Sequence, residues 1–76
     1  MPVVFRKHGL RFVVFVDDHP PPHVHVRGRG EARFMLGDPH GLMSNDGLNR
    51  ADIARARIAI RENRDELLRV WTDLHG

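Results

Sequence analysis

Three histidines and two aspartates lie close together around a run of three prolines, in the stretch DDHPPPHVHV. His23 and His25 are two residues apart, so on a β-strand both imidazoles project from one face and can chelate one ion. A further histidine precedes them across the prolines. Imidazole and carboxylate groups are ligands for zinc, nickel, copper and iron. One interpretation is therefore a site for one of these ions, with ligands drawn from His19, His23, His25 and Asp18, or Asp17 in its place.

The residues after the prolines also suit phosphodiester chemistry. A metal-independent ribonuclease needs a general base, a general acid and cations that bind the phosphate. The catalytic candidates are His23, His25 and Glu31, and the phosphate-binding candidates are Arg27, Arg29 and Arg33. Arg27 and Arg33 would oppose a bound cation, which counts against the metal interpretation. The chain has few aromatic residues, so its sequence does not indicate a platform for stacking bases.

A third interpretation gives these side chains no chemistry. In it the histidines and arginines cover a solvated sheet face, and Glu31 pairs with Arg27 across a hairpin. His8, His40 and His75 fall on turns or near a terminus, so we expect no functional role for them. The sequence leaves all three interpretations open.

The composition indicates a small protein made of one domain, residues 1–76. Twelve basic residues, eleven of them arginine, outnumber ten acidic residues and give a formal charge of +2. The absence of cysteine excludes disulfides and thiolate zinc ligands, and it fits a reducing cytoplasm. No stretch has the length of a membrane span or the pattern of a signal peptide, so we expect a cytoplasmic protein with no membrane partner. A chain this short buries a limited core, which makes a homodimer a further expectation.

Two parts of different character would position the candidate residues. Residues 1–36 predict a sheet, with a hairpin over 3–16 and alternating strands over 23–27 and 31–36. The alternation directs the valines after the prolines toward the core and the histidines toward the opposite face. Residues 37–48 are rich in Gly, Pro, Ser, Asn and Asp and predict a loop.

Residues 49–75 show helical spacing of apolar residues, with Asn49 as a suitable N-cap. The sequence NRDE, which begins at Asn63, matches a capping box and predicts either two helices or one helix bent sharply there. Trp71 is expected to anchor the core or to lie in a partner interface. We therefore predict an α+β fold, in which an antiparallel sheet of about four strands carries the C-terminal helices on its apolar face. The face with the histidines and arginines would stay open.

Several motifs have a recognisable order: PPHVHV at 21–26, GEARF at 30–34, and Asn63-Arg64…Leu67-Leu68…Trp71 in the helical part. With these motifs the chain resembles the bacterial domain of unknown function 4160 family, from residue 1 to about residue 75. The resemblance implies a small prokaryotic cytoplasmic protein, encoded beside a second small protein and proposed to form a toxin–antitoxin-like module.

The family motif places its histidines at His19, His23 and His25, whereas Pro20 and His40 are particular to this sequence. It carries over no catalytic residue. From the resemblance and the residues together we expect a module component that binds or acts on RNA or DNA through the histidine–arginine face, with a small protein from a neighbouring gene as its partner. A metal-binding module and a partner-binding protein without catalysis are the alternatives.

Overall fold

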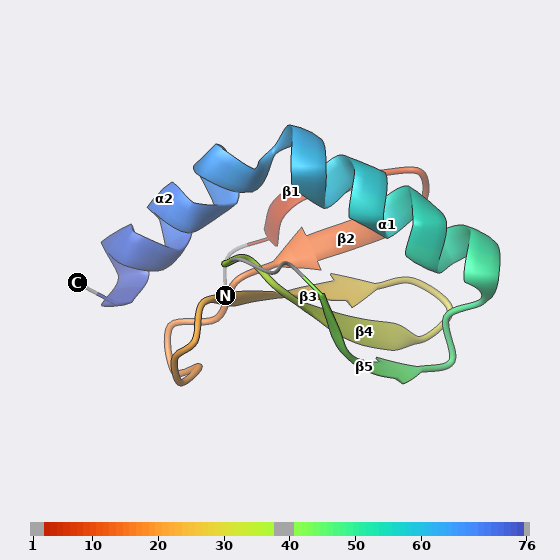
Figure 1. Ribbon diagram of the computed structural model, residues 1–76, viewed down its shortest axis with the longest axis horizontal. Helices are drawn as coiled ribbons and strands as arrows, with labels where there is room; N and C mark the ends of the chain where they lie inside the picture. The colour runs from red at the N-terminus through yellow and green to blue at the C-terminus, as the bar shows by residue number, and fades with distance from the viewer. Residues whose placement is uncertain (1–2, 38–40, 76) are drawn as a thin grey trace.

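The five strands of this protein form one antiparallel sheet, and two C-terminal helices cover one side of it (Figure 1). The computed structural model describes residues 3–37 and 41–75. Neighbouring strands in space are also neighbours in the chain, so the first and last strands form the two edges of the sheet. The elements are β1 (Val3–Lys7), β2 (Leu10–Val13), β3 (His23–Arg27), β4 (Glu31–Met35), β5 (Leu42–Asp46), α1 (Arg50–Glu62) and α2 (Arg64–His75). The predicted α+β fold is confirmed.

The prediction of a loop over residues 37–48 is wrong, because this segment contains β5. The strand pairs with β4 through the neighbours Ala32↔Asn45 and Arg33↔Ser44. Its side chains are mostly exposed, because it lies at the edge of the sheet. An edge strand of this kind does not need alternating apolar residues, so its polar composition gave a loop signal. His40 lies outside the described residues.

The strand predicted to reach residue 16 ends earlier, at Val13. From Val14 onward the chain leaves the sheet, and it returns as β3 only at His23. Val14 is still fully buried and belongs to the core. The early departure matters for the site because the connecting segment carries the aspartates back over the start of β3.

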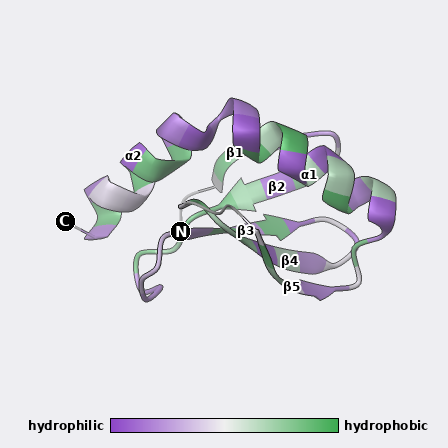
Figure 2. Cartoon of the chain, viewed as in Figure 1, coloured by the Kyte–Doolittle hydropathy of each residue, from purple (hydrophilic) through white to green (hydrophobic). Residues whose placement is uncertain are grey.

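The core fills the space between the sheet and the helices. Phe12, Val24 and Val26 contribute fully buried side chains from the central strands. Leu67 and Trp71 face them from α2. Figure 2 shows hydrophobic and hydrophilic residues alternating along both helices, as expected of helices with one buried face. The prediction that Trp71 anchors the core is confirmed.

The helical part is two helices, separated at Asn63. Asn63 adopts φ −118° and ψ 18°, and its side-chain amide donates to the Ala59 carbonyl at the end of α1. Arg64 then donates through Nε to the Leu36 carbonyl at 2.8 Å, which ties the junction to the end of β4. The side chain of Asn63 therefore stabilises the end of the first helix, whereas the predicted capping box would have it start the second.

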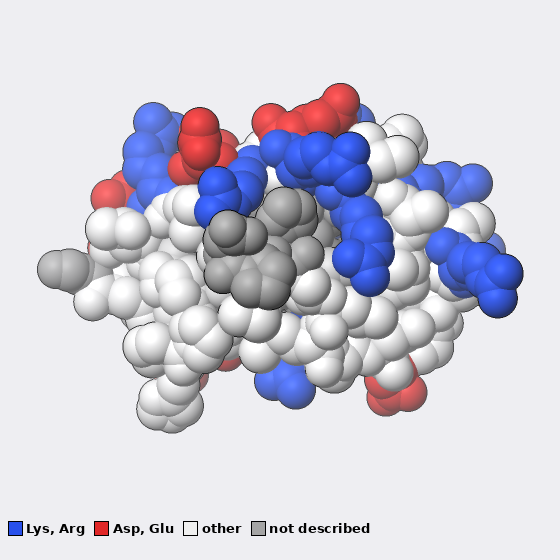
Figure 3. Space-filling model, viewed as in Figure 1, with Lys and Arg blue, Asp and Glu red and all other residues white. Residues whose placement is uncertain are grey.

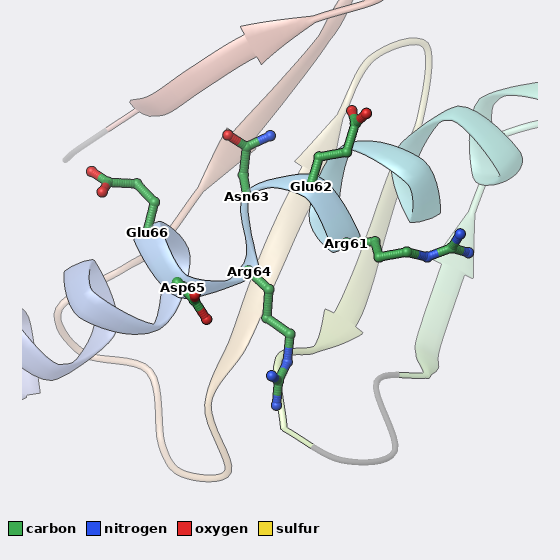
Figure 4. A pocket seen from close by; sticks show the side chains of 6 residues that line it. All are labelled: Arg61, Glu62, Asn63, Arg64, Asp65 and Glu66. Atoms are coloured by element: carbon green, nitrogen blue, oxygen red, sulfur yellow. The ribbon is translucent and has the colours of Figure 1, made fainter.

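A surface hollow lies at this junction, lined by residues 61–66 (Figure 4). The labelled side chains radiate away from one another, and they do not converge on a shared point. Acidic and basic side chains alternate over the helical layer (Figure 3). We attribute the hollow to the bend between the helices and place no site there.

Candidate metal centre

Asp18, His23 and His25 meet at one point above the start of β3. The Oδ2 atom of Asp18 lies 3.2 Å from Nε2 of His23 and 3.0 Å from Nε2 of His25. One ligand atom from each of the three residues lies within 4.8 Å of the other two. The structure thus brings two imidazole nitrogens and one carboxylate oxygen to the mutual spacing of ligands around one ion.

Strand geometry explains why the two histidines share a face. Val24 lies between them and Val26 follows His25, and both valines are fully buried, so the odd-numbered residues of β3 point to the other side. His25 lies opposite Val13 of β2. Because β2 ends at this residue, the chain that follows is free to cross over the histidines and deliver Asp18.

The other ring nitrogen of each histidine, Nδ1, is also hydrogen-bonded. Nδ1 of His23 donates to the carbonyl of Pro21 at 2.9 Å, and Nδ1 of His25 donates to Oε2 of Glu31 at 3.0 Å. The other oxygen of Glu31 accepts a hydrogen bond from Nε of Arg27 at 2.9 Å. The hydrogen bond from His25, together with that from Arg27, lowers the pKa of Glu31 below its usual value. Contacts of this kind fix the orientation and tautomer of metal-binding histidines.

The site is largely shielded from water. The side chains of His23, His25 and Asp18 are 6%, 12% and 21% exposed. Trp71 of α2 lies against His23, with ring centroids 5.2 Å apart, and Phe15 meets His25 edge-on at 4.6 Å. The expectation of a fully open histidine face is therefore wrong at His23, which is buried beside α2.

His75, for which we expected no role, also supports the site. Its Nε2 lies 3.0 Å from the backbone oxygen of Asp18, and its Nδ1 lies 2.8 Å from that of Trp71. Its ring stacks on Trp71 with centroids 3.8 Å apart. The i, i+4 spacing of these two residues in a helix was the available sequence signal. The end of α2 thus holds the segment that carries Asp18.

The remaining candidates lie around this group. His19 is exposed and does not belong to it. Arg29 is on the turn between β3 and β4, with Nε 4.0 Å from Asp52, and Arg33 is exposed, with Nε donating to Ser44. Of the candidate ribonuclease residues, the structure brings His23, His25 and Glu31 close together, with Arg27 beside Glu31. It does not bring Arg29 into this group.

A comparison with protein families confirms the resemblance expected from the PPHVHV, GEARF and helical motifs. Residues 9–72 match the model of the family described as "Domain of unknown function (DUF4160)". This chain belongs to the DUF4160 family. The matched region of this DUF4160 domain contains all three residues of the metal-spaced group, as well as Glu31 and Trp71. His75 lies beyond the match.

No curated protein and no solved structure has a significant match to the chain. Among the described residues, no helix has the length and apolar character needed to cross a bilayer. The match over residues 9–72 shows the family, whose description names no function.

Proposed function

We propose that this DUF4160 domain binds a divalent transition metal ion, zinc first, through Asp18, His23 and His25. The observation that carries the proposal is the spacing of their ligand atoms, with Oδ2 of Asp18 3.0 and 3.2 Å from the two imidazole nitrogens. Two ligands that each lie about 2.1 Å from one ion, at angles of roughly 90–110°, are about 3.0–3.4 Å apart. The Asp18 oxygen therefore has the spacing of a neighbouring ligand to each imidazole nitrogen, and all three ligand atoms lie within 4.8 Å of one another.

The hydrogen bonds of the two histidine rings support the same proposal. A neutral imidazole carries one N–H, and both histidines here have an oxygen acceptor at Nδ1. With the proton on Nδ1, the Nε2 of each ring presents a lone pair to a carboxylate oxygen that has lone pairs of its own. An ion between them would turn these contacts into coordination bonds. With an ion bound, both nitrogens of each ring are satisfied in the neutral form, whereas without one the same contacts need a proton on both nitrogens of each ring.

The ligand set has recognisable chemistry. Two histidines and one carboxylate leave coordination positions for water or a substrate, as in catalytic zinc sites and in mononuclear iron(II) sites. The positive charge of Arg27 is offset by its contact with Glu31, which reduces the repulsion expected from the sequence. Copper and nickel also accept these ligands. An ion bound by these three residues would have coordination positions free for water or a small ligand.

The metal-independent ribonuclease draws less support from the same geometry. Glu31 is engaged by two donors and its pKa is lowered, which makes it a weak general base. His23 is buried and has contacts at both ring nitrogens. The toxin–antitoxin-like role, the partner from a neighbouring gene, the homodimer and the cytoplasmic location stay predictions that follow from the sequence and its resemblance.

The test is to titrate metal-free protein with zinc, nickel, copper and iron(II) by calorimetry, and to measure the bound metal after dialysis. We expect one ion per chain for the preferred metal. Asp18→Asn and His25→Ala should abolish this stoichiometric binding. Asp17→Asn and His19→Ala are matched controls, because they change the neighbouring aspartate and histidine and should leave binding unchanged.

The proposal fails if the wild-type chain binds none of the four metals. It also fails if His19→Ala removes the ion as completely as His25→Ala does, since the exposed histidine would then be a ligand.

A further inference from the structure

Three arginines form a straight row across the face of the sheet opposite the helices. The strand registers place Arg6 beside Arg11, and Arg11 beside Arg27. The next residues along the strands, Phe12 and Val26, are fully buried under the helices, so the arginines point to the other side. Arg6 and Arg11 were not among the residues singled out from the sequence, because only the register aligns them.

The row is exposed and lacks compensating charge along most of its length. Arg6 and Arg11 are both exposed, and neither forms an ion pair with a described residue. Like charges directly opposite each other on neighbouring strands destabilise a sheet. The same line of paired residues continues through Glu31 of β4 and Asp46 of β5, which are acidic. The positive charge is thus concentrated on β1, β2 and β3, with Arg33 exposed on the same face.

A row of this kind fits a linear polyanion better than a single phosphate. Neighbouring strands are about 4.8 Å apart, so the three arginines span roughly 10 Å in a line. Guanidinium groups match phosphate geometry and can bind it with two parallel hydrogen bonds. On this face the segment between β2 and β3 crosses over His25, and its Phe15 ring lies 5.2 Å from the Arg27 guanidinium carbon (Figure 1). A row of arginines on an exposed surface suits a single strand, whose phosphates can follow the row.

We propose that the row Arg6–Arg11–Arg27 binds the phosphodiester backbone of single-stranded nucleic acid. The contacts are to phosphates, so binding depends on salt and is nearly independent of base sequence. The scarcity of aromatic residues on the chain agrees with this, because stacking contributes little. The proposed nucleic-acid site contains none of the proposed metal ligands. It is linked to them only through Arg27, which donates to Glu31, the residue that also accepts from His25.

The experiment measures fluorescence anisotropy of labelled oligo(U) and oligo(dT) in EDTA, over a range of salt concentrations. Three phosphate contacts give a slope of about −2 in a plot of log K against log salt. Arg6→Gln with Arg11→Gln should weaken binding of both oligonucleotides at least tenfold in low salt and reduce the slope to about −0.7.

The control pair is Arg50→Gln with Arg61→Gln, which removes the same charge from exposed positions on α1 and should change affinity less than twofold. Thermal unfolding confirms that all variants are folded.

Three results would overturn the inference: no binding of either oligonucleotide in low salt, an equal loss in both variant pairs, or binding of a duplex or of polyglutamate as tight as that of the single strands. Because EDTA removes any ion, failure here leaves the metal proposal standing. Failure of metal binding likewise leaves this test intact.

Discussion

Replacing Gly30 with alanine tests the close approach of the turn before β4 to the end of β5. A Cβ added at Gly30 would lie 2.3 Å from the Asp46 oxygen and 2.6 Å from Cα of Gly47. Non-bonded heavy atoms at optimal separation are about 3.5 Å apart, so the backbone must retreat by about 1 Å. Such a shift weakens the pairing of β4 with β5 at its end, where Glu31 lies opposite Asp46. It also weakens the hydrogen bond that Gly28 N donates to Gly30 O in the turn.

The cost can be worked out from these contacts. Losing about two hydrogen bonds at roughly 1 kcal/mol each, with about 1 kcal/mol of strain, gives about 3 kcal/mol. Alanine also restricts the unfolded chain, which offsets about 0.7 kcal/mol. The net loss is about 2 kcal/mol, which lowers Tm by roughly 8–16 °C for a domain of this size.

Thermal unfolding followed by circular dichroism gives the answer, with Gly37→Ala as the matched control. An added Cβ at Gly37 meets nothing within 4 Å, so this variant keeps only the effect on the unfolded chain and should be slightly more stable than wild type. The two substitutions therefore have opposite predicted signs. If Gly30→Ala melts within 2 °C of wild type, β5 does not approach the turn as described.

Further predictions concern Glu31 and the cap of α1. Glu31→Gln leaves one oxygen acceptor where His25 and Arg27 now use two, so metal affinity measured by calorimetry should fall roughly 10–100-fold. The pKa of Glu31 is lowered in the folded protein, so its carboxylate stabilises the fold above the pKa of the unfolded chain, and this stability is lost as pH falls through the lowered value. Glu31→Gln should therefore flatten the acid side of the metal-free protein's Tm profile, and an unchanged profile would contradict this. Asn49→Ala removes the acceptor of the Asp52 N–H at 2.8 Å and should lower Tm by roughly 4–8 °C, whereas Asn49→Ser should stay near wild type.

The elements with strong periodicity were predictable from the sequence. The alternation over β3 and β4 identified the apolar side chains that are buried but not His23, and the polar interruption at Asn63 located the junction of the two helices. The fifth strand was not predictable in the same way. Its pairing depends on hydrogen bonds to β4, and an exposed edge strand imposes little pattern on its side chains.

The candidate site was predictable in part for a related reason. The spacing of His23 and His25 placed both on one face of a strand. Which of Asp17, Asp18 and His19 joins the two histidines depended on the path of the chain after Val13, which no local pattern specifies. The contribution of His75 required knowing that the end of α2 reaches the same segment.

The contact between His75 and Asp18 joins residues 57 positions apart, whereas the three proposed ligands lie within one short stretch of the chain. An unfolded chain can therefore gather the same ligands around an ion, without the restraint on Asp18 that α2 supplies. An ion stabilises the native state only by the ratio of its affinities for the folded and unfolded chains. The rise in Tm on adding metal would then measure how much the tertiary structure, including the contact from the distant helix, raises the metal affinity of a peptide that already chelates.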